Sequence, residues 1–266
     1  MAHDEQWLTP RLQTAATLCN QTPAATESPL WLGVDLGTCD VVSMVVDRDG
    51  QPVAVCLDWA DVVRDAALTE GVPSHVTAMT GIDALTHAIE AYSALNATPF
   101  TDSLAIGAIA MIGKSLPKAV GYGHDLAARE SMLLASCMAG MAFSSAGLGL
   151  CHAMAHQPGA ALHIPHGLAN AMLLPTVMEF NRMVCRERFS QIGRALRTKK
   201  SDDHDAINAV SELIAEVGIG KRLGDVGATS AHYGAWAQAA QEDICLRSNP
   251  RTASLEQIVG LYAAAQ

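Results

Sequence analysis

The chain changes its pattern near residue 65, and this change limits the possible folds more than any other feature. From Ala66 onward, alanine and methionine are frequent and apolar residues recur three and four positions apart, which is the periodicity of α-helices. We expect one helix with Pro73 in its first turn and a second one capped by Thr101. Further helices are expected at about 124–143, 168–180, 185–197, 204–217 and 254–264. No convincing strand follows residue 66, so the sequence predicts a mainly α fold.

Residues 31–57 have a different pattern, because they are rich in β-branched residues and interrupted by glycines. Asp49-Gly50 is typical of a tight hairpin turn, and residues 53–57 provide the returning strand. Residues 1–29 are largely polar. We therefore predict two domains, a short β-hairpin fragment in residues 1–65 and an all-helical domain in residues 66–266.

The composition excludes several classes of protein. Hydrophobic residues make up 50% of the 266 residues, enough for a sizeable core, and the net charge of -10 argues against a nucleic-acid partner. Seven cysteines without a CxxC pair, and an N-terminus without a secretion signal, indicate a reduced cytoplasmic protein. Residues 132–154 are apolar, but serines and His152 interrupt them. A buried core helix is therefore expected there, and no membrane partner.

Four histidines and one aspartate have the spacing of metal ligands. Asp83 and His87 are four positions apart, as are His152 and His156, so each pair shares one face of a helix. His166 follows a proline, and seven of the ten histidines lie between residues 75 and 166. A lone histidine is usually a hydrogen-bonded core residue, but Asp83 lies among apolar neighbours, where an unpaired carboxylate is costly. Imidazole and carboxylate ligands suit Fe(II) or Zn(II).

Three long motifs surround these residues, and together they resemble a known family. They are Thr80-Gly-Ile-Asp83-Ala-Leu-Thr-His87, Gly147-Leu-Gly-Leu-Cys-His152-Ala-Met-Ala-His156 and Pro165-His166-Gly-Leu-Ala-Asn. Residues 66–266 resemble the C-terminal domain of the iron-type (group III) alcohol dehydrogenases, in particular the branch of ethanolamine utilisation. The resemblance implies Fe(II), with Zn(II) as a substitute, held by Asp83, His87, His152 and His166.

The resemblance also implies a reaction. The metal stabilises the oxygen of a small alcohol as an alkoxide, or polarises the aldehyde, and hydride passes to or from NAD(H). His156 matches a histidine near the reacting centre that is not a ligand, and it can relay the proton; the alternative is a packing histidine. Phe143 and Met141 can line the pocket, although core packing is expected. His75 and His163 match no ligand position.

No dinucleotide-binding pattern occurs in these 266 residues, because Gly218 to Gly224 lacks the G-x-G-x-x-G spacing and follows a helix. In this family the nicotinamide cofactor is bound mainly by an N-terminal Rossmann-like domain. We therefore doubt that these residues bind NAD(H), and we expect weak or no turnover. The family's cleft lies between its two domains, so an exposed former interface is expected to favour self-association.

Residues 33–47 instead contain Gly33-Val-Asp35-Leu-Gly37-Thr38, which resembles the first phosphate hairpin of the actin/Hsp70-type ATPases, including the Hsp70-like protein of ethanolamine utilisation. Only this hairpin is present, which indicates a fusion of two truncated proteins. Two alternatives to a dehydrogenase domain stay open: an ATPase or chaperone-type module resting on Asp35, and a non-catalytic metal-binding remnant. The ethanolamine resemblance further implies association with a bacterial microcompartment.

Overall fold

A computed structural model describes residues 31–36, 41–46, 52–56, 66–196 and 203–266. The chain forms two compact units, Met1–Thr69 and Glu70–Gln266, and each is described by itself. In the first unit, strands β1 (Trp31–Leu36), β2 (Val41–Val46) and β3 (Pro52–Cys56) form an antiparallel sheet in the order β1-β2-β3. The turns predicted at Gly37-Thr38 and Asp49-Gly50 lie outside the described residues.

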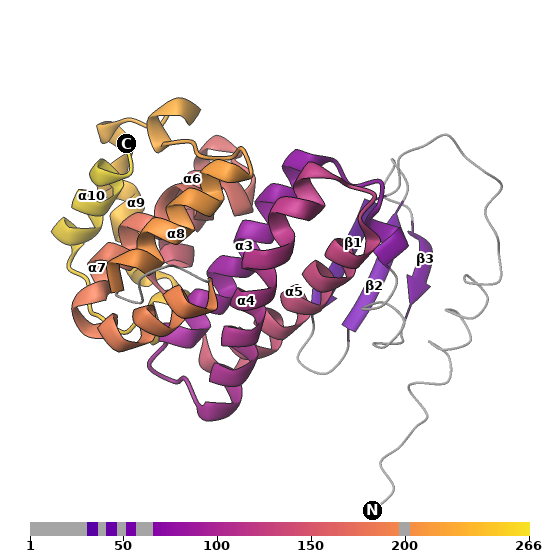
Figure 1. The fold of residues 1–266 in the computed structure, drawn as a ribbon. Coiled ribbons are helices and arrows are strands. Elements are labelled where there is room, and N and C mark those ends of the chain that lie inside the picture. The colour runs from indigo at the N-terminus through magenta and orange to yellow at the C-terminus, as the bar shows by residue number, and fades with distance from the viewer. Residues whose placement is uncertain (1–30, 37–40, 47–51, 57–65, 197–202) are drawn as a thin grey trace, which may run out of the picture. The chain divides into compact units, whose positions relative to one another are not determined.

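The second unit is built from helices, and its described residues contain no strand (Figure 1). This confirms the helical fold that the periodicity predicted. The α-helices are α3 (Ser74–Ser93), α4 (Pro99–Gly121), α5 (Leu126–Ala146), α6 (Leu150–Leu162), α7 (His166–Ala195), α8 (Asp203–Glu216), α9 (Ser230–Glu242) and α10 (Leu255–Ala264). Short 3-10 helices in this unit are η3 (Leu223–Val226) and η4 (Ile244–Ser248), and η2 (Ala66–Thr69) ends the first unit. Helix α3 packs against α4, α5 and α7, and α6 packs against α7 and α9.

Two helix starts differ from the sequence prediction. Helix α3 begins at Ser74, so Pro73 lies just before it rather than in its first turn. Helix α4 is capped by Thr98, whose hydroxyl accepts from the N–H of Thr101 at 3.3 Å, while the Thr101 hydroxyl accepts from the N–H of Thr98 at 2.8 Å. Thr101 is therefore the third residue of a reciprocal capping box, not the cap itself.

Residues 166–195 form one continuous helix, so the prediction of two helices at 168–180 and 185–197 is wrong. The polar residues between these two ranges are satisfied by side-chain contacts. Asn181 is 5% exposed and pairs with Asn249, and Arg182 forms ion pairs with Glu179 and Asp203. Helix α9, which the sequence did not reveal, is held by the aromatic rings of Tyr233 and Trp236 against Tyr262.

The apolar stretch predicted as one core helix at 132–154 is divided between α5 and α6, which meet at an angle of 107°. The break falls at Gly147, whose φ of 85° is a conformation that favours glycine. Helix α4 is also long and apolar enough to cross a membrane by composition. It packs against both α3 and α5, as a core helix does.

Candidate metal centre

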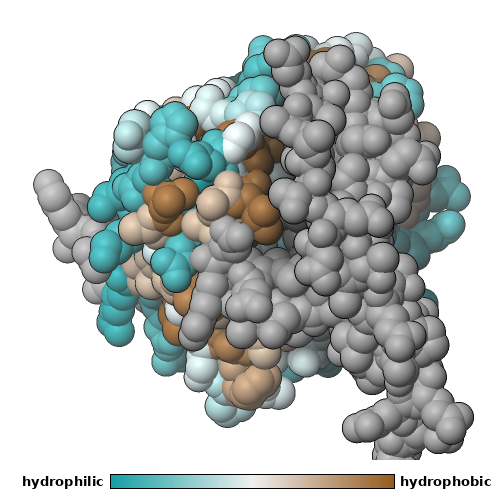
Figure 2. All heavy atoms as spheres, turned by 90° about the vertical axis from the view of Figure 1, so that its right-hand side faces the viewer, coloured by the Kyte–Doolittle hydropathy of each residue, from teal (hydrophilic) through white to brown (hydrophobic). Residues whose placement is uncertain are grey.

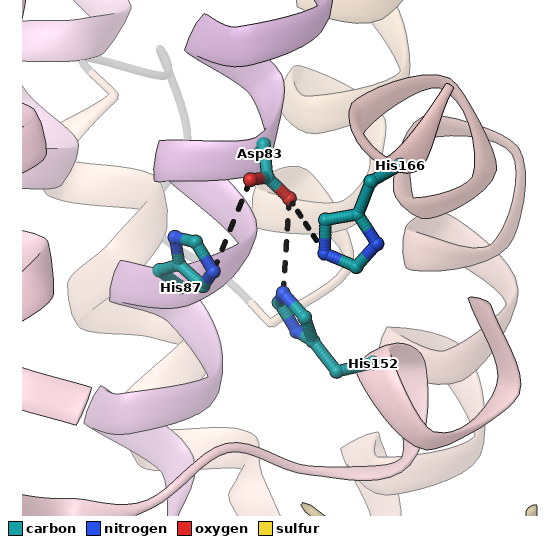
Figure 3. Close-up of side chains that lie close together, drawn as sticks. All are labelled: Asp83, His87, His152 and His166. Atoms are coloured by element: carbon teal, nitrogen blue, oxygen red, sulfur yellow. Dashed lines mark ion pairs between the residues drawn. The ribbon is translucent and has the colours of Figure 1, made fainter. Parts of the chain in front are cut away.

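Three helices bring one carboxylate and three imidazoles together. Asp83 and His87 project from one face of α3, His152 from the first turn of α6, and His166 is the first residue of α7. Figure 3 shows these four side chains pointing toward a common centre. One ligand atom from each can be chosen so that all lie within 4.8 Å of one another. Below, these four residues are called the metal group.

The nitrogen–oxygen distances within the metal group are longer than those of typical hydrogen bonds. Asp83 Oδ1 lies 3.4 Å from His166 Nε2 and 3.7 Å from His152 Nε2, and Asp83 Oδ2 lies 3.9 Å from His87 Nε2. Ligand atoms about 2.0–2.2 Å from a shared ion have mutual separations of this order. Three imidazole nitrogens and one carboxylate oxygen also match the ligand types of Fe(II) and Zn(II). Both the geometry and the donor set therefore fit a single divalent transition metal.

A glycine permits this close approach. A Cβ at Gly167 would collide with the backbone carbonyl of Met79 on α3 and would lie 3.3 Å from Asp83 Cβ. The first turn of α7 therefore rests directly on the backbone of α3, and His166 reaches Asp83 from there. This contact explains why the glycine follows the histidine in the third motif.

The buried carboxylate of Glu90 supports His152. Glu90 Oε2 accepts a hydrogen bond from His152 Nδ1 at 2.5 Å, and Oε1 accepts from the N–H of Cys151 at 2.7 Å. His152 is 1% exposed, so burial opposes its charged form, but the negative charge of Glu90, the hydrogen bond that His152 donates to Glu90 and the nearby carboxylate of Asp83 raise its pKa to about 9. Because Glu90 holds Nδ1, Nε2 is the ring nitrogen that faces Asp83 and the centre of the group.

The pKa values of the other three members of the metal group are shifted in the direction that favours the deprotonated forms, which can bind a metal. Burial raises the pKa of Asp83, but the interaction with His152 and the positive charges of His87 and His166 outweigh it and lower the value to about 2. Burial lowers the pKa of His87 to about 4, against the opposing charge of Asp83. Burial also lowers the pKa of His166. At neutral pH, Asp83 is therefore charged and His87 neutral, as metal ligands must be.

Asn170 lies beside the metal group on α7, one turn after His166. Its amide nitrogen lies 2.6 Å from Asp83 Oδ1, 3.2 Å from His152 Nε2 and 3.1 Å from His166 Nε2. The residue is fully buried. Neither Asn170 nor Glu90 was singled out from the sequence, although both lie at helical spacing from a predicted ligand, where orienting groups are expected.

His156 stands next to the metal group but outside it. Its ring stacks on that of His166 with centroids 5.4 Å apart, and its side chain is 41% exposed. His156 Nδ1 lies 2.7 Å from Asp243 Oδ2, and Asp243 Oδ1 accepts from the N–H of Cys245 at 2.8 Å. Both Asp243 oxygens are thus hydrogen-bonded, which identifies a histidine–carboxylate pair that the sequence did not reveal.

Of the remaining residues considered in the sequence analysis, one borders the metal group and the others are exposed. The Phe143 ring lies 4.6 Å from that of His87, so it borders the metal group. Met141 is 41% exposed, so the expectation of core packing is wrong for it. His75 and His163 are exposed and lie outside the metal group, and His163 ends α6 in a left-handed conformation with φ of 54°.

Comparison with known proteins identifies the family. A model of the Fe-containing alcohol dehydrogenase family, C-terminal domain, matches residues 77–266. The chain belongs to the iron-containing alcohol dehydrogenases. Similar proteins in this family include the "probable alcohol dehydrogenase EutG" of Escherichia coli strain K12, 98% identical over 204 residues, which are 77% of this chain and 52% of that relative. The protein of the same name in Salmonella typhimurium is 87% identical over 76% of this chain and 51% of its own. The chain thus spans about half the length of these curated relatives.

Solved structures of iron-containing alcohol dehydrogenases share the helical fold. A 1,3-propanediol oxidoreductase is 40% identical with a TM-score of 0.74, covering 76% of this chain and 55% of its own. An alcohol dehydrogenase from Oenococcus oeni is 38% identical with the same TM-score of 0.74, covering 76% of this chain and 54% of its own. The resemblance inferred from the three motifs is therefore confirmed for the helical domain.

Proposed function

We propose that Asp83, His87, His152 and His166 bind one Fe(II) ion, with Zn(II) as a substitute, in a domain for alcohol and aldehyde oxidoreduction. The observation that carries the proposal is the 3.4–3.9 Å spacing of the three Nε2 atoms around the Asp83 carboxylate. When bound, a divalent metal supplies Lewis-acid polarisation of an alcohol or aldehyde oxygen. Small alcohols or aldehydes and NAD(H) are the proposed substrate and cofactor, by membership of the family.

In our proposal, three residues near the metal group have separate roles. Glu90 keeps Nε2 of His152 directed at Asp83, and Phe143 covers the ring of His87. His156 donates Nδ1–H to Asp243, which leaves Nε2 free to exchange a proton with a reacting hydroxyl. His156 is therefore proposed as the proton-relay residue, and its exposure supports exchange with solvent.

The metal site is tested by metal analysis of the purified 266-residue chain after loading with Fe(II) without oxygen, or with Zn(II). We expect one ion per chain, lost in His152→Ala and in His166→Ala. His163→Ala is the matched control, because that histidine is exposed and lies outside the metal group. Failure of the wild type to retain a stoichiometric ion would refute the assignment.

We propose that these 266 residues alone support little or no turnover, since their sequence contains no dinucleotide-binding pattern. NADH consumption with acetaldehyde tests this in the metal-loaded chain. Consumption that is proportional to protein, stopped by a chelator and absent from His152→Ala would contradict it. If no such consumption is seen, the result supports our proposal of an alcohol dehydrogenase domain by descent, which retains the metal chemistry without efficient hydride transfer.

For residues 1–65 we propose a separate origin, as a truncated actin/Hsp70-like fragment fused to the helical domain. Support comes from Asp35-Leu-Gly-Thr38 and from a family match that begins only at residue 77. No ATP binding is proposed, and calorimetry with Mg-ATP tests this. A cytoplasmic location, a place in ethanolamine utilisation and association with a microcompartment complete the proposal. The cytoplasmic location is supported by the seven cysteines without a CxxC pair, and the other two by the resemblance of the motifs.

Self-association is also proposed. Large apolar side chains are exposed on several helices, among them Phe100 at 63%, Met183 at 67% and Ile244 at 71%. Figure 2 shows apolar residues interspersed with hydrophilic ones on one face of the molecule. Sedimentation velocity at increasing concentration tests the proposal, and a monomer at every concentration would contradict it.

A further inference from the structure

The start of α6 is held by side chains from other parts of the chain. Gly149, which precedes the helix, has no side chain to cap it. The N–H of Leu150 instead donates to Asn249 Oδ1 at 3.0 Å, and the N–H of Cys151 donates to Glu90 Oε1 at 2.7 Å. Two N–H groups without partners inside the helix are thereby satisfied. The next residue is His152, so the anchored turn is the one that carries a member of the metal group.

Asn249 is itself fixed by a reciprocal amide pair. Asn181 Nδ2 donates to Asn249 Oδ1, and Asn249 Nδ2 donates to Asn181 Oδ1, each at 3.0 Å. Asn249 Nδ2 also donates to the carbonyl of Arg251 at 2.6 Å. Both asparagines are 5% exposed. Because Asn181 belongs to α7, the pair connects the helix that carries His152 to the helix that carries His166.

The side chains of Glu90 and Asn249 pack closely against Gly149. A Cβ at Gly149 would lie 2.8 Å from Glu90 Oε1 and 2.9 Å from Asn249 Oδ1, so a side chain there would displace both acceptors. Glycine therefore lets the carboxylate and the amide approach the same turn of backbone. A buried polar group in such a network costs stability when one partner is removed, so each member constrains the others.

We propose that Asn249 is a positioning residue for the metal group. It fixes the first turn of α6 through the N–H of Leu150 and ties that turn to α7 through Asn181, and so sets the distance between His152 and His166. This inference rests on the proposed function, because its consequence is measured as metal binding.

Ser93, which lies near Asn249, offers a matched control. A small cavity is lined by Asn249, Asn181, Glu90 and Ser93, among others. The Ser93 hydroxyl is buried and has no hydrogen-bond partner among the residues that the structure describes. Ser93→Ala therefore changes the pocket without removing a link to α6.

The experiment is titration of the full 266-residue chain with Co(II), following the visible spectrum that reports ligand geometry. Wild type binds Co(II), and Asn249→Ala is expected to weaken the affinity about tenfold, the lower end of effects seen for groups that orient ligands, and to alter the spectrum. Asn181→Ala, which leaves Asn249 in place without its partner, is expected to weaken the affinity measurably but less than Asn249→Ala does. The double variant should bind no worse than Asn249→Ala, because the two residues act as one unit.

Two controls separate positioning from general destabilisation. Ser93→Ala should bind Co(II) like wild type. Tyr262→Phe removes another hydrogen bond to α6, the 2.8 Å bond from Tyr262 to the carbonyl of Met154, and should lower the melting temperature without changing affinity or spectrum. Wild-type affinity and spectrum in folded Asn249→Ala would overturn the inference. If that variant does not fold, unchanged binding by Asn181→Ala overturns it. Absence of binding by the wild type would instead refute the proposed function.

Discussion

His87 and His152 have stacked rings with centroids 4.6 Å apart, yet their surroundings move their pKa values in opposite directions. Burial dominates at His87 and lowers its pKa to about 4, whereas Glu90 and Asp83 overcome the burial of His152 and raise its pKa to about 9. The difference comes from Glu90, whose carboxylate contacts only the second ring directly. At the residue scale, one buried carboxylate therefore decides which imidazole carries the proton before metal binds.

The low pKa of His87 predicts a pH dependence of stability in the metal-free protein. Between its ordinary value of 6.5 and about 4, the unfolded chain holds a proton on His87 that the folded chain does not. The contribution of His87 to stability must therefore fall as the pH is lowered through this window, by about 1–2 kcal/mol between pH 7 and pH 5, while the raised pKa of His152 offsets part of the loss. Urea unfolding with a chelator at the two pH values measures the loss. His87→Gln should lose less, and an equal loss in both proteins would contradict the prediction.

Glu90→Gln is predicted to weaken Zn(II) binding about tenfold. The amide keeps the shape of the side chain and its acceptor for the N–H of Cys151, but it removes the negative charge that orients His152. Isothermal titration of the two proteins measures the change. Glu179→Gln, on the exposed part of α7, is the matched control and should bind like wild type. Equal affinities for Glu90→Gln and the control would show that the charge at position 90 does not support the site.

At the element scale, the metal group depends on how closely α7 approaches α3. Gly167→Ala would place a methyl group against the carbonyl of Met79, and overpacking of this kind typically costs about 1–3 kcal/mol. We predict this loss in urea unfolding, together with weaker metal binding because His166 moves away from Asp83. Gly234→Ala on α9 is the control, since its Cβ meets nothing within 4 Å. That variant should gain about 0.5–1 kcal/mol from helix propensity, and a similar gain in Gly167→Ala would contradict the packing argument.

Elements also show where sequence patterns misled. Two helices were expected where α7 is continuous; Asn181 and Arg182, which lie between the expected helices, are satisfied by partners from elsewhere in the chain. Helix α9 was missed because its aromatic contacts, Trp236 and Tyr233 with Tyr262 of α10, lie outside its own sequence. Local periodicity does not contain such long-range contacts.

At the scale of the whole molecule, the metal group joins helices from three distant parts of the chain. An ion bound there stabilises only the folded state, by about 2.7 kcal/mol when its free concentration is one hundred times Kd. We predict that Zn(II) raises the melting temperature of wild type, and that a chelator reverses the rise. His152→Ala should not respond in calorimetry with and without Zn(II). A rise of equal size in that variant would place the stabilising ion elsewhere.

The sequence alone determined the helical character of residues 66–266 and the identity of the four residues that meet, because periodicity, helix spacing and the three motifs are local properties. The family followed from the same motifs. Tertiary structure decided what surrounds them. Glu90, Asp243 and Asn249 lie 62 to 99 residues along the chain from the groups they contact, which are His152, His156 and the N–H of Leu150. Such partners are chosen by packing, which brings together residues that no short pattern relates.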